Sequence, residues 1–194
     1  MMIALRCRCG KLRGQVESRR VAARLVCYCK DCQAYGRFLG TGVLDAAGGT
    51  EVAAMPPSAV RFEAGLEHLA CMSLGPRGTL RWYASCCRTP VGNTPRNPRV
   101  SYVGLPRACM DAPAEVLDRE MGPLRARVNT ESATAKMETT PASTGWAVCR
   151  LAAMLLKARL GGGYKDNPFF APQGTPVRTP QVLSLEERKA LTPG

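Results

Sequence analysis

Seven of the ten cysteines in this chain fall into three tight clusters, and this grouping constrains the fold more than any other feature. The first cluster is Cys7-Arg8-Cys9-Gly10, the second has the spacing C-x-C-x-x-C, and the third is a Cys-Cys pair. Thiolates are soft ligands suited to Zn(II), and a tetrahedral site needs sulfurs that come together from separate turns or strands. The clusters therefore predict a zinc protein, with metal ligands Cys7, Cys9, Cys27, Cys29, Cys32, Cys86 and Cys87.

A framework of disulfides is the alternative, and two observations argue against it. Residues 1–6 lack the apolar stretch of a signal peptide, so a cytoplasmic, reducing location is expected. Two cysteines at i and i+2 of a strand point the same way, with Cα atoms roughly 6.6 Å apart. That separation is near the upper limit for a disulfide and suits two ligands of one metal.

Composition places the chain among globular proteins built from short elements. With 194 residues, 45% hydrophobic and 22% charged, it can form one core with an appended lobe. Its 19 glycines and 15 prolines favour short strands joined by turns over long helices. No run of about 18 apolar residues is present, so neither a membrane span nor a membrane partner is expected.

The net charge of +12 is concentrated in the part that bears the clusters. Residues 1–110 carry 16 Lys and Arg against 6 Asp and Glu, whereas residues 111–194 carry 11 against 9. Solubility and compensation of thiolate charge explain this excess most simply; attraction of an anionic ligand, such as a carboxylate-bearing thiol or a nucleic acid, is the alternative. Lys30, Arg24 and Arg37 lie in or beside the central cluster and are expected to offset its thiolates.

Glycine and proline punctuation predicts a mainly β fold of short antiparallel strands over residues 1–110. The expected strands span residues 6–16, 23–29, 52–55, 60–64, 66–74, 79–84 and 100–105. Cys7 and Cys9 are expected to share one strand face, and Asp31 to cap a short helical turn that contains Cys32. The adjacent pair near residue 86 can bind one metal only where the backbone turns sharply, and Cys87 is the firmer ligand of the two.

Residues 111–194 are expected to form a helical extension packed on the β domain. A helix opens at residues 111–115 and ends near Gly122, and a linker or mobile loop follows at 130–142. The adjacent aromatics Phe169 and Phe170 are expected to anchor the chain as it returns from its longest helix.

That longest helix is predicted from Ser143 to about Leu160. Its apolar stripe consists of Trp146, Cys149, Ala153, Leu156 and Leu160. We expect the stripe to dock on the β core, with a partner-binding face as the alternative. Ser184 and Glu187 form a capping box that opens a last helix.

The three clusters together resemble the glutathione-dependent formaldehyde-activating enzymes and their relative centromere protein V, over roughly residues 5–105. The resemblance implies a β-tent-like zinc-binding domain with two zinc ions. It implies a structural site at Cys7, Cys9 and Cys87, and an open, catalytic site at Cys27, Cys29 and Cys32. The family's late C-x-x-C-G is here Ala84-Ser85-Cys86-Cys87-Arg88. Ala84 therefore stands where a ligand is expected, and Cys86 is the candidate replacement.

The function that this resemblance implies is a zinc-dependent carbon–sulfur lyase acting on a small thiol adduct, such as one of glutathione. A zinc held by three cysteines keeps a fourth position for a substrate sulfur or water. A non-catalytic zinc module that binds a protein or a nucleic acid is the alternative, although an aromatic content of 6% argues against a stacking platform for single strands. A cysteine redox sensor is the third hypothesis.

Overall fold

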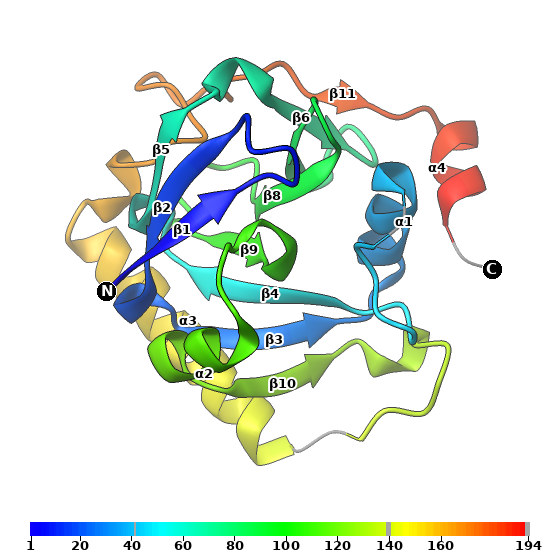
Figure 1. Ribbon diagram of the computed structural model, residues 1–194, viewed down its shortest axis with the longest axis horizontal. Helices are drawn as coiled ribbons and strands as arrows, with labels where there is room; N and C mark the ends of the chain where they lie inside the picture. The colour runs from blue at the N-terminus through cyan, green and yellow to red at the C-terminus, as the bar shows by residue number, and fades with distance from the viewer. Residues whose placement is uncertain (41, 139–140, 193–194) are drawn as a thin grey trace.

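The computed structural model describes residues 1–40, 42–138 and 141–192, which form two sheets and four α-helices (Figure 1). The smaller sheet has the strand order β1-β2-β5 and is antiparallel throughout. Its strands are β1 (Met2–Arg6), β2 (Arg13–Glu17) and β5 (Val60–Ala64). Gly14 lets β2 approach β5 closely, because a Cβ at this position would lie 2.2 Å from the carbonyl oxygen of Arg61.

The larger sheet has the strand order β10-β3-β4-β9-β8-β7-β6-β11. Its strands are β3 (Ala23–Cys27), β4 (Thr50–Met55), β6 (Leu69–Ser73), β7 (Leu80–Ala84), β8 (Thr89–Thr94), β9 (Val103–Pro106), β10 (Leu124–Val128) and β11 (Gln181–Val182). The two edge pairs, β10 with β3 and β11 with β6, are parallel, and the inner pairs are antiparallel.

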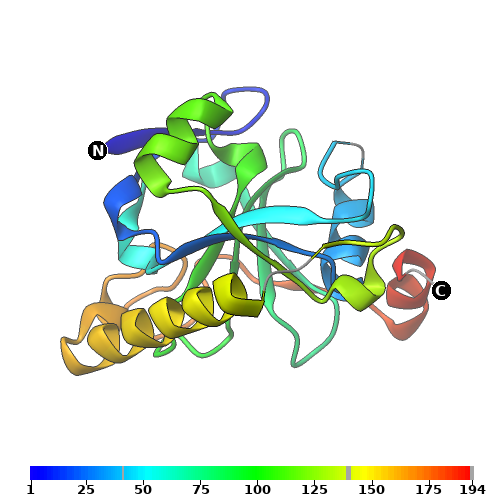
Figure 2. The same cartoon turned by 90° about the horizontal axis from the view of Figure 1, so that it is seen from below.

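The helices lie around these sheets. They are α1 (Lys30–Leu39), α2 (Ala114–Met121), α3 (Pro141–Leu160) and α4 (Leu185–Leu191). Helices α1 and α4 lie side by side at one side of the molecule (Figure 1), whereas α3 is an outermost element beneath the large sheet (Figure 2). Within the described residues, none of these helices is long and apolar enough to cross a bilayer.

The core lies between the two sheets and is closed by the aromatic pair that follows α3. Trp82 of β7 and Phe169 are fully buried, with ring centroids 5.2 Å apart. Phe169 also meets the ring of Phe62 on β5 at 5.5 Å, edge to face. Phe170 lies 6.4 Å from Trp82. The expected anchoring role of this pair is confirmed, because it joins a distant segment to both sheets.

The mainly β expectation holds for the abundance of strands, but helix is as abundant as strand, at 33% against 30%. Strand β5 has the predicted bounds, and the other predicted strands overlap observed ones. The structure adds β8 and the parallel edge strands β10 and β11, which the sequence did not indicate. Both edge strands come from the part after residue 110. The domain boundary at that residue stays a prediction.

Two of the predicted helix ends are confirmed, and the predicted cap at Asp31 is wrong. Helix α2 ends before Gly122, as expected, and the capping box of α4 is present, with Glu187 N donating to Ser184 Oγ at 3.2 Å. Asp31 does not cap α1; the N-cap is Cys29, and Asp31 lies in the first turn. Of the predicted linker, residues 139 and 140 lie outside the described residues, and residues 130–132 form a single 3-10 turn.

The predicted docking of the apolar stripe of α3 is wrong. Trp146, Leu156 and Leu160 are 41%, 59% and 79% exposed, and Ala147 is the one buried residue of this helix. Ala147 packs on Ala23 and Ala126, so the opposite face of α3 is the one turned to the sheet. A small residue at this contact lets the helix backbone come close to the strands, and the larger apolar side chains are left outside.

Candidate metal centres

The first centre is formed by two turns that are far apart in the sequence. Cys7 and Cys9 follow β1, and Cys86 and Cys87 lie in the turn between β7 and β8. All four sulfurs lie within 4.8 Å of one another. The Sγ–Sγ distances are 3.6 Å for Cys7–Cys9, 3.8 Å for Cys7–Cys86, 3.3 Å for Cys9–Cys86 and 3.9 Å for Cys86–Cys87. Four sulfurs around Zn(II) should be about 3.8 Å apart, so the set fits a closed tetrahedral site.

Tight backbone turns bring these sulfurs together. Strand β1 ends at Arg6, so Cys7 and Cys9 lie in a turn and do not share a strand face as predicted. Gly10 closes that turn with φ +77° and donates its N–H to the carbonyl of Cys7 at 2.8 Å. Arg88 closes the second turn with φ +55°. This second turn is the sharp bend that a site using both Cys86 and Cys87 requires.

Hydrogen bonds from neighbouring residues favour thiolates at this centre. The backbone N–H of Leu12 donates to Cys7 Sγ at 3.3 Å, and the Thr89 hydroxyl lies 3.1 Å from Cys87 Sγ. Burial raises the pKa of Cys87, but the bonds from Thr89 and from Cys9 outweigh burial and lower the pKa to about 6. The pKa of Cys86 is raised by burial and by sharing protons with Cys9 and Cys7. The four sulfurs could therefore hold a metal ion, with Cys87 the more readily deprotonated of the pair at this turn.

The second centre lies where β3 passes into α1. Cys27 ends β3, Cys29 is the N-cap of α1 and Cys32 is in its first turn. Their three sulfurs lie within 4.8 Å of one another, and the N–H of Cys32 points at Cys29 Sγ from 3.4 Å. Helix N-termini favour thiolates because their free N–H groups carry partial positive charge. The predicted three-cysteine set is thus brought together, with one tetrahedral position left for another ligand.

Metal-free, these three thiols share their protons unequally. Hydrogen bonds from Cys29 and Cys32 lower the pKa of the Cys27 thiol. The pKa of Cys32 is raised, because its thiol is hydrogen-bonded to Cys27, which has the larger effect, and to Cys29. A divalent metal that binds all three sulfurs would displace the protons that the two remaining thiols carry.

Four residues from other elements surround this centre, and sequence reasoning did not identify them: Arg81, Asn93, Tyr102 and Asn129. Arg81 on β7 is only 5% exposed, yet no carboxylate pairs with it among the described residues. Its Nη1 lies 3.9 Å from Cys32 Sγ and 3.4 Å from Asn93 Oδ1, and its guanidinium stacks over the Tyr35 ring at 5.1 Å. A buried cation of this kind requires a nearby negative charge, which the three cysteines supply when metal binding deprotonates them.

Asn129 and Tyr102 complete the surroundings. Asn129 Nδ2 donates to Cys27 Sγ at 3.3 Å. Burial raises the pKa of Tyr102 to about 12, and the negative charges of Cys32 and Cys27 add to the rise. Gly104 leaves room for this phenol, because a Cβ there would lie 2.8 Å from the Tyr102 hydroxyl. Tyr102 therefore remains a neutral phenol at physiological pH.

The cations that the sequence suggested for this centre have other partners. Arg24 is buried and pairs with Glu51 and Asp118, tying β3 to β4 and α2. Arg37 donates to the carbonyl of Leu191 at 3.3 Å. Lys30 is exposed. The buried cation beside this centre is Arg81, and the sequence carries one signal for it, since Arg81 lies inside the strand predicted at residues 79–84.

A family of unknown function (DUF6151) matches residues 1–178, which include both cysteine centres and α3. No curated protein matches the chain.

Proposed function

The chain belongs to the DUF6151 family, and we propose that it is a two-zinc protein whose three-cysteine centre binds a small anionic thiol and acts on its adducts as a carbon–sulfur lyase. The four-cysteine centre has the structural role in this proposal. The observation that carries it is Arg81, a buried guanidinium beside Cys32 that no described carboxylate neutralises. The resemblance of the clusters to the glutathione-dependent formaldehyde-activating enzymes supports the lyase assignment and a β-tent fold.

The charges at the three-cysteine centre favour an added thiolate. Zn(II) with three thiolates has a formal charge of minus one, and a substrate thiolate makes it minus two. Such an excess is unfavourable in a partly buried site unless a cation lies nearby. Arg81 offsets one of these charges from within the site, at 3.9 Å from Cys32 Sγ. Zinc, when bound here, would lower the pKa of a coordinated thiol.

The remaining neighbours are hydrogen-bond donors, which suits a ligand with acceptor oxygens. Asn129 already donates to Cys27 Sγ, and Asn93 accepts from Arg81, which leaves the amide N–H groups of Asn93 for another acceptor. Tyr102 keeps its proton because its pKa is about 12. A thiol that carries carboxylates or an adduct hydroxyl offers such acceptors, and an uncharged apolar thiol does not.

Cobalt substitution tests the proposal, because the visible spectrum of a cobalt–thiolate site reports its ligands. Adding glutathione to the cobalt form, alone or with formaldehyde, should change the spectrum. Arg81→Met should weaken the change and Arg81→Lys should retain part of it, because Lys keeps the charge. Lys30→Met, a loss of charge at an exposed neighbouring position, is the matched control and should leave the response intact.

An unchanged spectrum at millimolar thiol would mean that the centre has no exchangeable position for this ligand. The thiol-adduct activity would then be dropped in favour of a non-catalytic zinc module. A spectral change without any accelerated formation or breakdown of the glutathione–formaldehyde adduct would leave thiol binding and remove the lyase assignment.

A further inference from the structure

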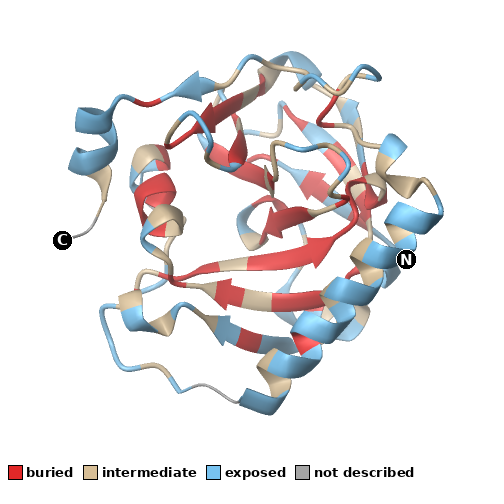
Figure 3. Ribbon diagram, turned by 180° about the vertical axis from the view of Figure 1, so that it is seen from behind, coloured by how far each residue is buried: buried red, intermediate tan, exposed pale blue. Residues whose placement is uncertain are grey.

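Helix α3 turns its apolar stripe to the outside of the molecule. Seen from behind, α3 is the element nearest the viewer and is exposed along most of its length (Figure 3). Within the apolar stripe, Leu156 is 59% and Leu160 79% exposed, and Cys149 and Ala153 are also exposed. Large apolar side chains gathered on one exposed face mark an interaction site more often than an ordinary surface.

The helix has apolar residues on two opposite sides. Ala147 packs on the sheet, and the apolar stripe points the other way. An apolar helix face is normally packed against another surface. The fold covers one side of α3, so the apolar stripe is left for a partner.

The charges around α3 indicate what this partner is. The helix contains no Asp or Glu, whereas Arg150, Lys157 and Arg159 interrupt its apolar residues. Because residues three or four apart lie on the same side of a helix, Arg150 and Lys157 form one cationic row directly beside the apolar stripe. An acidic surface with an apolar layer beneath it complements this arrangement.

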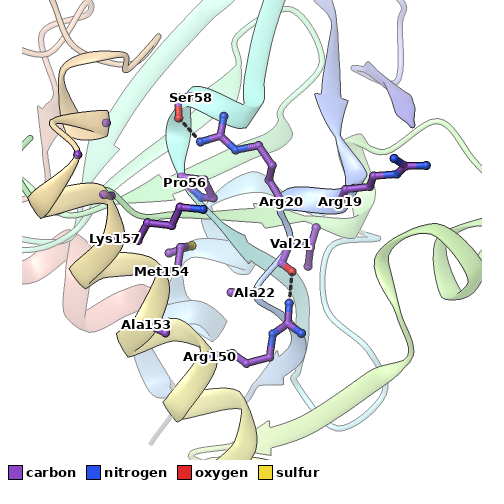
Figure 4. A pocket seen from close by; sticks show the side chains of 13 residues that line it. Arg19, Arg20, Val21, Ala22, Pro56, Ser58, Arg150, Ala153, Met154 and Lys157 are labelled. Atoms are coloured by element: carbon purple, nitrogen blue, oxygen red, sulfur yellow. Dashed lines mark hydrogen bonds between the residues drawn. The ribbon is translucent and has the colours of Figure 1, made fainter.

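A hollow of about 640 Å³ adjoins the cationic row, and Ala153 at the margin of the apolar stripe also lines it. It lies between α3 and residues 19–22 and 56–58, at the end of β3 opposite the three-cysteine centre (Figure 4). Arg150 and Lys157 extend into it from α3, Arg20 runs along the facing wall toward Ser58, the Arg19 side chain points away from α3, and the lining includes no acidic residue. Arg150 donates to the Val21 carbonyl at 3.3 Å. Arg20 donates to Ser58 Oγ at 2.8 Å and also pairs with the Glu17 carboxylate at 3.9 Å.

We propose that α3 is a membrane-surface helix that docks on bilayers rich in anionic phospholipid. The apolar stripe enters the boundary between headgroups and acyl chains, and Arg150 and Lys157 of the cationic row bind lipid phosphates. Each Lys or Arg near an acidic leaflet adds to binding, and the buried apolar side chains hold the helix there. The absence of a spanning helix among the described residues concerns crossing a bilayer and is compatible with contact at its surface.

Trp146 occupies the position that an interfacial aromatic takes. It is 41% exposed at the end of the apolar stripe, with Arg125 over one part of its ring system at 5.0 Å and Arg150 at 4.9 Å. Tryptophan favours the headgroup level of membranes, where its ring meets both cations and apolar chains. A second copy of this chain is a poorer partner, because pairing two α3 helices would bring two acid-free cationic rows together.

Vesicle flotation tests this proposal with the intact zinc-loaded protein. Vesicles of phosphatidylcholine with an equal part of phosphatidylglycerol should retain the protein, vesicles of phosphatidylcholine alone should not, and added salt should weaken retention. Leu156→Glu should lower the affinity at least about tenfold because it places a charge in the apolar stripe. Lys157→Glu should lower it at least about fivefold, since each basic residue near the leaflet contributes a factor of this size.

Matched controls come from α4, where Leu185 is 84% exposed and Lys189 is exposed. Leu185→Glu and Lys189→Glu make the same chemical changes outside α3 and should leave retention unchanged. Trp146 fluorescence should shift to the blue with acidic vesicles. Trp146→Phe should remove that shift, because the emission of the buried Trp82 should not change when vesicles are added. Unchanged melting temperatures would show that the variants fold.

Equal retention on neutral and acidic vesicles, or equal loss for the α3 and α4 variants, would overturn the proposal. So would a dimer in light scattering that Leu156→Glu converts to a monomer, since the apolar stripe would then be covered by a second copy. None of these outcomes bears on the proposed zinc chemistry, which the cobalt spectra test separately.

Discussion

At Arg88 the backbone adopts a conformation that residues other than glycine avoid, with φ +55°. The side chain offsets this strain by donating to the Phe38 carbonyl at 2.7 Å and by lying over the Phe38 ring at 5.5 Å. These contacts tie the turn of the four-cysteine centre to the C-terminal part of α1. They also explain how this chain accommodates an arginine at a left-handed position of the turn.

A comparison of two truncations at this position isolates the strain. Arg88→Ala and Arg88→Gly both remove the contacts with Phe38, but only glycine adopts a positive φ without steric cost. We expect Arg88→Gly to be more stable than Arg88→Ala by about 1 kcal/mol. Denaturant midpoints of the two zinc-loaded variants measure the difference. Equal midpoints would mean that the turn relaxes out of the left-handed region in the variants.

The two cysteine centres should respond differently to the loss of one ligand. Cys9→Ser should unfold or aggregate the protein, because structural zinc contributes about 10 kcal/mol or more in small domains, comparable to a whole folding free energy. Cys32→Ser should leave the protein folded and remove metal from the three-cysteine centre only. Zinc content and thermal melting measure both effects. Cys149→Ser, at an exposed cysteine of α3, is the control. Equal damage from both ligand variants would contradict the division into a structural and an open centre.

Residue spacing in the sequence was sufficient to find the seven cysteines but not their neighbours. C-x-C and C-x-x-C are local patterns, so the chain itself holds these sulfurs near one another. Arg81 and Asn129 come from positions 49 and 102 residues away from the cysteines they contact, and only the sheet brings them there. Lys30 is adjacent to the cysteines in sequence, but adjacent residues on a helix do not face the same way.

At the scale of elements, strands with clear alternation were predictable and strands with unusual composition were not. Strand β8 contains Pro90 and Gly92, which normally indicate a turn. A Cβ at position 92 would lie 3.0 Å from Val103, so this glycine serves close packing. Strand β10 carries two arginines and lies at the sheet edge, where one side stays exposed. Tertiary pairing decides both cases, and no local pattern reports it.

The segment after α3 depends on Phe169 for its attachment. This ring is fully buried against Trp82 and Phe62, which belong to different sheets. Phe169→Ala should therefore cost about 3–5 kcal/mol in unfolding free energy, through lost burial and the cavity left behind. Denaturant unfolding measures this cost. Leu185→Ala, at an 84% exposed position, should cost little; a small loss for Phe169→Ala would mean that the aromatic cluster closes over the gap.

For the whole molecule, the two centres join different parts of the fold. The four-cysteine centre links the turn after β1 to the turn between β7 and β8, and so connects the small sheet to the large one. The three-cysteine centre lies at the start of a single helix, on the chain that leads from β3 into α1. Metal bound at the first centre would therefore hold the two-sheet arrangement, whereas metal bound at the second would hold only a local bend and a ligand position.

Metal removal should consequently occur in two steps. The reduced, metal-replete protein should contain about two zinc ions per chain. A limited amount of chelator should remove the zinc of the three-cysteine centre first, because it has fewer protein ligands, and the melting temperature should change little. Removal of the second zinc should unfold the protein. Elemental analysis and circular dichroism on the same samples follow the two steps.

Acidification should also remove zinc from the three-cysteine centre before the four-cysteine centre. The direction of the change in stability with pH follows from the number of protons that each state binds. Metal-bound thiolates carry no protons, whereas the thiols of the unfolded chain, with pKa values of about 8.5, carry theirs at neutral pH. The unfolded state thus binds more protons than the native state, so stability rises with pH and falls as acid is added. Cys32→Ser should begin with about one zinc and show only the second step. A zinc content near zero in the wild type would remove the metal proposal altogether, and simultaneous loss of both ions would show that the two centres depend on each other.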